Sequence, residues 1–251
     1  MGRRDGVATT IEELGLADWR RQVGEIYVEV RRLARIDPAA ALAHWQTERE
    51  RLFREHLQSP VLLKERPAFR AQHFDHDPTL RFELVVSQVA APETATGAAA
   101  AASATIQPGD VATAISAVSA SQFGLSFAPP LLDLPTSGGG AMVFRKIGSV
   151  EIPFAAGPRS LSVYWMEGYA GGLFVPFRDA TNGHETYGAG RYAVDAAKSA
   201  DLGGDPVRGT IVIDFNFAYQ PSCAFDPKWS CPLAPRENWL DVPVRAGERI
   251  A

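Results

Sequence analysis

Hydrophobic residues near the start of the chain recur at the three-to-four-residue spacing of an α-helix. One apolar stripe consists of Trp19, Val23, Ile26, Tyr27, Val30 and Leu33, and a second contains Leu42, Trp45, Leu52, Phe53 and His56. Asp37-Pro38 lies between them, where Asp suits a helix cap and Pro suits a first turn. Ser59-Pro60 closes the second stripe. We therefore predict that residues 1–60 form an N-terminal helical hairpin that packs on the rest of the chain.

After Pro60 the pattern changes to short alternating or β-rich runs separated by Gly, Pro and Asn. These runs span residues 80–89, 142–147, 150–154, 161–167, 173–177, 186–194 and 209–217. Because most of them have no helical pattern between them, antiparallel pairing is favoured. The predicted fold class is α+β, with the αα-hairpin followed by a mainly antiparallel β-sandwich or barrel-like domain over residues 61–251.

An Ala-rich tract at about residues 90–122 interrupts the predicted strands and contains five consecutive alanines from Ala98. A long structureless loop is uncommon inside a compact domain. We therefore predict an insertion between two strands, either disordered or partly helical, and we expect no chemistry in it.

Composition narrows the possible partners. The 251 residues carry a net charge of −4, so no overall cationic field favours nucleic acid or an anionic membrane. The first residues lack the apolar core of a signal peptide, and no apolar run approaches the length of a membrane span. We therefore expect a cytoplasmic protein with no nucleic-acid or membrane partner. Flavin, nicotinamide and haem signatures are absent from the sequence, and its cofactors, if it has any, are unknown.

Polar residues interrupt one otherwise apolar run. Strand alternation over residues 211–217 places Asp214 and Asn216 together on the face opposite the aliphatic and aromatic side chains. One interpretation is a sheet with one packed and one wet face. The other is that both side chains point into a pocket.

Residues 178–183 have the chemistry of a turn, in which Asp179 caps the turn and glycine accepts a positive φ. A functional alternative makes Arg178 an anion donor and Asp179 a base or metal ligand. Farther on, Gly190 weakens a strand unless backbone, ring or ligand approaches closely. Strand alternation places Arg191 on the same face as Tyr187. Arg191 either binds substrate or forms a structural salt bridge to Asp214 or Glu185, and both interpretations are kept.

Cys223 and Cys231 are the two cysteines, and they do not by themselves make a zinc site. In a reducing compartment we expect thiols that pack as small buried groups, with pairing in exported relatives as the alternative. A nucleophilic cysteine needs a base such as histidine, and His184 is the single histidine after Arg81.

Several long motifs in the C-terminal half carry a resemblance to a known family. They are Tyr164 to Gly183, Glu185 to Tyr192, Asp214 to Cys223, Trp229 to Pro235, Glu237-Asn238 and Val242 to Glu248. Together they resemble the bacterial and archaeal family called domain of unknown function 1684, from the Trp19 helix to Glu248. Ala189 and Gln220 depart from the family pattern. The resemblance implies little about function, because the family name records no established activity.

Three functions are consistent with these residues. The first is a small-molecule-binding β-domain with a polar and aromatic pocket whose ligand-binding candidates are Arg178, Tyr187, Arg191, Asn216 and Tyr219. The second is a hydrolase- or lyase-type enzyme with Asp179, Glu185 or Asp214 as general base, together with a divalent cation such as Mg²⁺ or Ca²⁺. The third is a structural or interaction domain in which the same side chains only tie loops together.

Overall fold

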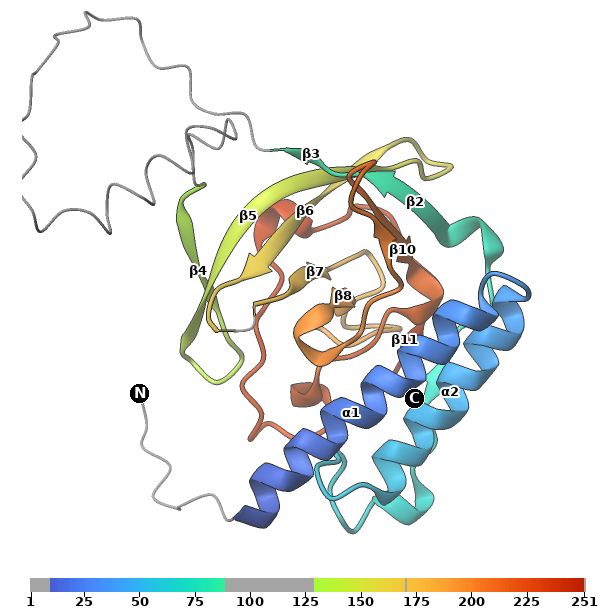
Figure 1. Cartoon of the computed structure of the whole chain (residues 1–251), viewed down its shortest axis with the longest axis vertical. Helices are drawn as coiled ribbons and strands as arrows, with labels where there is room; N and C mark the ends of the chain where they lie inside the picture. The colour runs from blue at the N-terminus through green and yellow to red at the C-terminus, as the bar shows by residue number, and fades with distance from the viewer. Residues whose placement is uncertain (1–9, 89–128, 170, 251) are drawn as a thin grey trace, which may run out of the picture.

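The computed structural model describes residues 10–88, 129–169 and 171–250. The Ala-rich insertion predicted at about residues 90–122 lies outside the described residues. Figure 1 shows two long helices lying against one side of a curved β structure.

The N-terminal hairpin consists of α1 (Thr10–Leu33) and α2 (Pro38–Glu55), as the sequence predicts. α1 buries Ile26, Tyr27 and Val30 from the predicted stripe. The Asp37 carboxylate accepts a hydrogen bond from the Ala40 amide at 3.0 Å, so it caps α2 ahead of Pro38. α2 ends before His56, somewhat earlier than the Ser59-Pro60 boundary indicates.

The larger sheet is antiparallel, with the strand order β3-β5-β6-β7-β8 and β4 paired to β5. Its strands are β3 (Ser87–Gln88), β4 (Leu131–Pro135), β5 (Ala141–Ile152), β6 (Arg159–Met166), β7 (Leu173–Phe177) and β8 (Arg191–Asp195). The two runs predicted at 142–147 and 150–154 are one strand, β5, whose register shifts between Lys146 and Gly148. This bulge changes which face of the sheet the following side chains occupy.

Two smaller sheets complete the β structure. One has the order β2-β10-β9 and the other pairs β1 with β11, all antiparallel. Their strands are β1 (Gln72–His73), β2 (Arg81–Val85), β9 (Gly204–Asp205), β10 (Thr210–Asp214) and β11 (Glu248–Arg249). Short 3-10 turns are η1 (Arg66–Ala68), η2 (Pro78–Leu80), η3 (Ala196–Lys198), η4 (Phe215–Phe217), η5 (Ser222–Ala224) and η6 (Arg236–Asn238). After β2 the chain crosses at Val86, whose amide binds the Gly209 carbonyl, and enters the larger sheet as β3.

Each face of the larger sheet has its own hydrophobic core. On one face Phe144, Tyr164 and Phe174 pack with α1 and α2. On the other face an inner core fills the space between the larger sheet and β10, and it includes Val163, Val175, Ile213 and Phe215. The described chain is therefore an α+β structure. The two helices cover one face of the larger sheet, the sheet that contains β10 covers the other, and the β part is barrel-like.

Two predicted strands are shorter than the pattern indicates. The run at 186–194 contributes only β8, which starts at Arg191. The run at 209–217 leaves the sheet after Asp214, because the Asp214 carboxylate accepts the Asn216 amide at 3.0 Å and begins the turn η4. Asp214 and Asn216 therefore do not share a strand face. Within residues 10–88, 129–169 and 171–250, none of the helices combines the length and the apolar content of a membrane span.

Candidate functional site

Arg191 and Asp179, both predicted as site residues, form an ion pair with no exposed side-chain surface. Arg191 Nη2 lies 3.1 Å from Asp179 Oδ2, and the guanidinium also donates to the carbonyls of Val244, Ala246 and Glu248. Burial lowers the pKa of Arg191, and Asp179 is the main group that opposes this effect. The salt-bridge partner of Arg191 is thus Asp179, and the predicted partners Asp214 and Glu185 were wrong. The pair fixes the C-terminal segment on β8.

The Asp179 carboxylate also stabilises the turn that follows β7. Asp179 Oδ1 accepts the Thr181 hydroxyl at 2.6 Å, and Asp179 Oδ2 accepts the Val244 amide at 2.7 Å. This is the turn-capping geometry that the sequence predicts. Arg178, beside it, stacks over the Trp239 ring with 4.2 Å between guanidinium carbon and ring centroid.

Asp214 and Asn216 bind neighbouring segments. Arg81 Nη1 donates to Asp214 Oδ2 at 3.2 Å from the adjacent strand β2. Asn216 Oδ1 accepts a hydrogen bond from the Asp77 amide and Asn216 Nδ2 donates to the Asp77 carbonyl, so its side-chain amide binds both backbone polar groups of one residue. Both side chains are buried.

The three carboxylates predicted as general bases each have a different arginine partner. Asp179 pairs with Arg191, Asp214 pairs with Arg81, and Glu185 makes a two-pronged pair with Arg245 near the surface. The hydrogen bonds from Arg245 lower the pKa of Glu185. The binding and catalytic roles assigned to these residues from the sequence stay predictions, and the contacts found for them are to the protein itself.

Tyr219, another predicted site residue, belongs to a charged cluster that the sequence analysis missed. Its hydroxyl donates to Asp195 Oδ2 at 2.9 Å. The Arg49 guanidinium lies between the Tyr219 and Phe53 rings and pairs with the buried Glu248 carboxylate, whose Oε1 is 2.5 Å from Arg49 Nε. This cluster joins α2 to the C-terminal strand β11.

A pocket beside this cluster, called the inner pocket below, lies between α1 and the helix-facing side of the larger sheet. Its volume is about 280 Å³. It is lined by Arg20, Met142, Phe144, Met166, Gly172, Leu173, Phe174, Asp195, Ala197, Lys198, Ser230, Cys231 and Pro232. The sheet side chains are apolar, whereas the charged groups come from α1, from the end of β8 and from η3.

The charged end of the inner pocket contains two cations and one carboxylate. Lys198 Nζ is 3.0 Å from Asp195 Oδ2, which also accepts the Tyr219 hydroxyl. Burial disfavours the Lys198 cation, but Asp195 outweighs burial and raises the pKa of Lys198. Arg20 is exposed and has no ion pair with any described residue. Only the Asp-x-x-Lys spacing in the sequence hinted at this pair, and such spacing is common on solvated turns.

Both predicted thiols lie at this side of the molecule. Cys231 lines the inner pocket, and Cys223 in η5 is buried next to it. The Tyr187 hydroxyl lies 3.7 Å from Cys223 Sγ and 3.4 Å from the Cys223 carbonyl oxygen. The structure therefore brings Tyr187 and Cys223 together.

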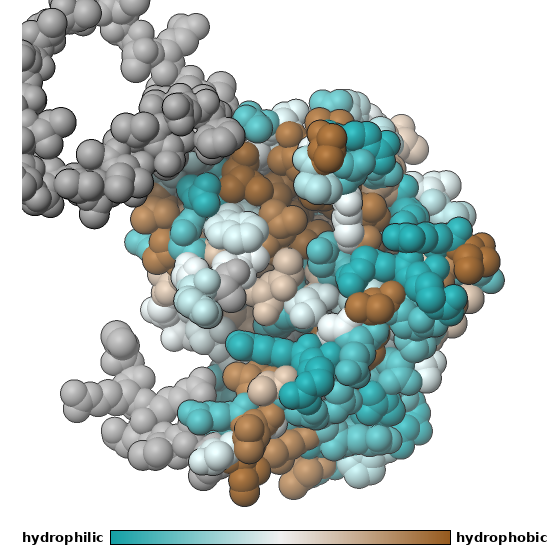
Figure 2. Space-filling view, viewed as in Figure 1, coloured by the Kyte–Doolittle hydropathy of each residue, from teal (hydrophilic) through white to brown (hydrophobic). Residues whose placement is uncertain are grey.

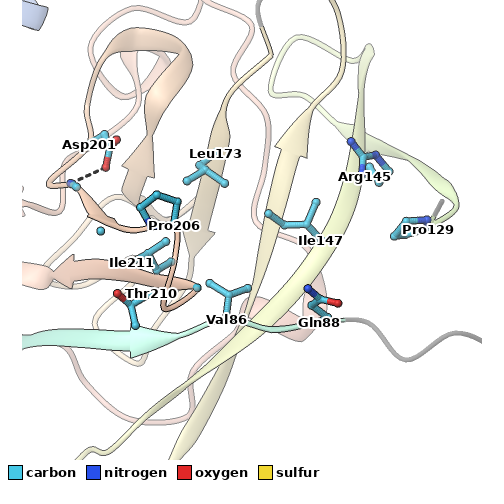
Figure 3. Close-up of a pocket in the computed structure, with 13 residues that line it drawn as sticks. Val86, Gln88, Pro129, Arg145, Ile147, Leu173, Asp201, Pro206, Thr210 and Ile211 are labelled. Atoms are coloured by element: carbon cyan, nitrogen blue, oxygen red, sulfur yellow. Dashed lines mark hydrogen bonds between the residues drawn. The ribbon is translucent and has the colours of Figure 1, made fainter. Parts of the chain in front are cut away.

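A larger hollow of about 660 Å³ lies on the opposite face of the larger sheet, toward β9 and β10. Figure 3 shows Val86, Ile147 and Ile211 lining it, and Figure 2 shows apolar surface in a hollow on this side. Its two charged residues are already engaged, since Arg145 pairs with Glu167 and Asp201 accepts the Gly203 amide. It is an apolar recess without the charged end of the inner pocket.

Among the described residues, no group of three or more His, Cys, Asp or Glu side chains is placed to hold a metal ion. Comparison with known proteins identifies a family and similar solved structures. Residues 118–249 match the model of the family described as "Protein of unknown function (DUF1684)".

The solution NMR structure of an uncharacterized protein from gene locus rrnAC0354 of Haloarcula marismortui is similar, with 29% sequence identity and a TM-score of 0.52. The match covers 85% of this chain and 95% of the archaeal one. No curated protein matches the chain.

Proposed function

Because this chain belongs to the family described as "Protein of unknown function (DUF1684)", we propose its function from the geometry of the inner pocket. The protein binds a small, largely apolar molecule that carries one negative charge. The observation that carries the proposal is that one pocket has aromatic and thioether side chains along its walls and two cationic side chains at one end.

The walls favour an apolar body. Phe144 and Phe174 stack on each other with 5.1 Å between ring centroids and form the base, and Met142 and Met166 are partly buried around them. Thioether side chains adapt to ligands of irregular shape. A volume of about 280 Å³ lies just below the roughly 300–1,000 Å³ usual for ligand pockets, so the ligand is smaller than a typical drug molecule.

The charges favour a monoanion. Arg20 and Lys198 supply two positive charges and Asp195 supplies one negative charge, which leaves one positive charge to be matched. An anionic group that accepts hydrogen bonds from both cations would be bound by charge-assisted contacts. The cytoplasmic location expected from the sequence is part of this proposal, which needs neither a membrane nor a nucleic-acid partner.

The test uses small aliphatic and aromatic carboxylates as probes, each compared with its neutral amide, by isothermal titration calorimetry on the full chain. We expect the carboxylates to bind and the amides to bind more weakly. Lys198→Met should weaken carboxylate binding by about tenfold, the effect of losing one charged hydrogen bond. Lys228→Met is the matched control, because Lys228 forms a similar pair with Asp226 at 2.9 Å and does not line the inner pocket.

A second pair of variants tests the walls. Met142→Trp should fill the inner pocket and abolish binding of every probe. Val143→Trp is its control, because Val143 is the next residue on β5, is 41% exposed and does not line the inner pocket. Equal affinities of carboxylates and amides, or equal effects of the two tryptophan substitutions, would contradict the proposal.

A further inference from the structure

Two arginine side chains stack on one exposed tryptophan. Trp239 directly follows η6, and 42% of its surface is exposed. The guanidinium carbon of Arg178 lies 4.2 Å from the centroid of the Trp239 ring, and that of Arg236 lies 4.7 Å from it. These three residues are called the arginine–tryptophan cluster below. Because one ring contacts both guanidinium groups, the two cations lie close enough for one ligand to contact both.

The two cations of the cluster have no counter-ion within the protein. Within residues 10–88, 129–169 and 171–250, neither guanidinium has a hydrogen-bond acceptor or an ion-pair partner. The acids next to the cluster in sequence are already engaged, since Glu237 accepts the Tyr164 hydroxyl at 2.7 Å and Asp241 pairs with Arg159. Two neighbouring like charges repel each other, and an anion that contacts both relieves this repulsion. The cluster therefore offers two unused forks of N–H donors to a negative ligand.

The backbone around the cluster is held in place by buried contacts. Asn238 is fully buried, and its Nδ2 donates to the Pro176 carbonyl at 2.7 Å, which fixes η6 on β7. The Arg178 amide donates to the Asn238 carbonyl at 3.0 Å, so Arg178 lies beside Trp239. The Trp239 indole donates from Nε1 to the Ala234 carbonyl at 3.0 Å. The ring is therefore preorganised, which lowers the cost of ordering it when a ligand binds.

The position of the cluster favours a protein partner over a small molecule. The inner pocket and the larger hollow are lined by other residues. A small ligand needs a concave site that covers most of its surface, whereas Trp and Arg are among the residue types that most often dominate the binding energy of protein interfaces. An exposed tryptophan with two unpaired arginines is therefore suited to a protein segment that carries negative charge.

We propose that the arginine–tryptophan cluster binds an extended acidic segment of a partner protein, with acidic residues at positions i and i+2. In an extended strand these two side chains point to the same side, roughly 6.5–7 Å apart. Two carboxylates at this spacing can reach two guanidinium groups that share one ring. Each carboxylate accepts a two-pronged, charge-assisted pair from one arginine. This site is separate from the inner pocket and does not depend on its ligand.

The test titrates two capped peptides of identical composition into the full chain and follows the Trp239 indole N–H signal by NMR. This signal is identified by its loss in Trp239→Phe. One peptide carries Asp-Thr-Asp between glycines, and the other carries Asp-Asp-Thr, which places its acids on opposite sides of an extended segment. We expect the first peptide to bind about tenfold more tightly, because it makes one more charged contact. Equal affinities of the two peptides would overturn the proposal.

Arginine variants assign the contacts. Arg178→Gln and Arg236→Gln should each weaken binding of the Asp-Thr-Asp peptide by about tenfold. Arg178→Lys keeps the charge and loses the fork, so its affinity should lie between those of Arg178→Gln and the unmodified protein. Arg35→Gln is the matched control, because Arg35 is an exposed arginine between α1 and α2 and its loss changes the net charge equally. An equal loss of affinity in Arg35→Gln would reduce the effect to net charge and overturn the site.

Two competitors exclude other ligands of the same charge. Inorganic phosphate and oligothymidylate should both move the Trp239 signal less than the Asp-Thr-Asp peptide does at the same concentration. Phosphate that binds as tightly as the peptide would overturn the proposal in favour of a simple anion site, and tighter binding of oligothymidylate would overturn it in favour of single-stranded nucleic acid. The arginine–tryptophan cluster and the inner pocket share no residue. Failure of either proposal therefore leaves the other intact.

Discussion

Arg191 on β8 and Asp179 after β7 form an ion pair from which solvent is wholly excluded, with 3.1 Å between Nη2 and Oδ2. The pair also holds the backbone of Val244 from both sides, because Asp179 accepts its amide and Arg191 donates to its carbonyl. A buried charge is costly when its partner is removed. These two residues therefore stabilise the packing of the C-terminal segment on β8.

The first prediction concerns this pair. Asp179→Ala should lower the free energy of unfolding by about 3–5 kcal/mol, because it leaves the Arg191 cation buried without a counter-ion. Urea denaturation measures the loss. Glu185→Ala is the control, since the Glu185–Arg245 pair is near the surface and its removal should change stability little. A similar loss in both variants would contradict the assignment.

The second prediction concerns Asp214, one of the carboxylates predicted to be catalytic. Asp214→Asn removes the charge that Arg81 faces and should cost roughly 1.5–3 kcal/mol, the usual contribution of a hydrogen bond to a charged group. It should leave the carboxylate affinity of the inner pocket unchanged, because Asp214 does not line that pocket. Denaturation and calorimetry on the same preparation separate the two effects, and a large loss of affinity without a loss of stability would restore the site role.

The third prediction concerns Gly190, just before β8. Its φ is +99°, and a Cβ there would collide with the Phe177 carbonyl oxygen. Gly190→Ala should therefore lower stability by more than about 1 kcal/mol, the cost of a left-handed backbone alone. Gly188→Ala is the matched control two residues away, where an added Cβ meets no atom closer than 3.9 Å. Thermal denaturation of the two variants gives the comparison, which fails if their melting temperatures agree.

The fourth prediction concerns pH. Burial lowers the pKa of His73, and its Nε2 is buried without a hydrogen-bond partner among the described residues. The unfolded chain therefore binds a proton at His73 more readily than the folded chain, so stability should fall as pH drops through about 6.5. His73→Phe should make this fall shallower in denaturation curves measured across that range. The same substitution at the exposed His184 is the control, and equal slopes in both variants would exclude His73 as the cause.

The helical hairpin could be predicted because its signals are local. The spacing of Trp19, Val23 and Tyr27 and the Asp37-Pro38 cap need no knowledge of the rest of the chain. The ion-pair partner of Arg191 could not be predicted in the same way. Asp179, Glu185 and Asp214 are all close enough to Arg191 along the chain, so sequence separation does not select one of them. Only the return of residues 244–248 across β8 selects Asp179.

The inner pocket was the least predictable feature. Lys198 and Asp195 look like a solvated pair on a turn, and Arg20 looks like a charge on the wet side of a helix. They become a site only because α1 lies across the ends of β5 and β6, a contact between residues more than a hundred positions apart. The prediction that Asp214 and Asn216 share one strand face was wrong for a local reason. The Asp214 carboxylate accepts a hydrogen bond from the Asn216 amide, and this contact ends the strand.

The pairing of β1 with β11 and of β2 with β10 sets the order in which this chain can fold. Gln72 meets Arg249, and Arg81 meets Asp214, so strands from the first third of the chain find their neighbours only in the last sixth. Contacts of such long sequence separation slow folding. On the ribosome the α1–α2 hairpin can form early, whereas β1 and β2 must wait, with open edges, until residues 204–249 emerge. Residues 72–85 therefore carry the strand edges that stay unpaired longest during synthesis.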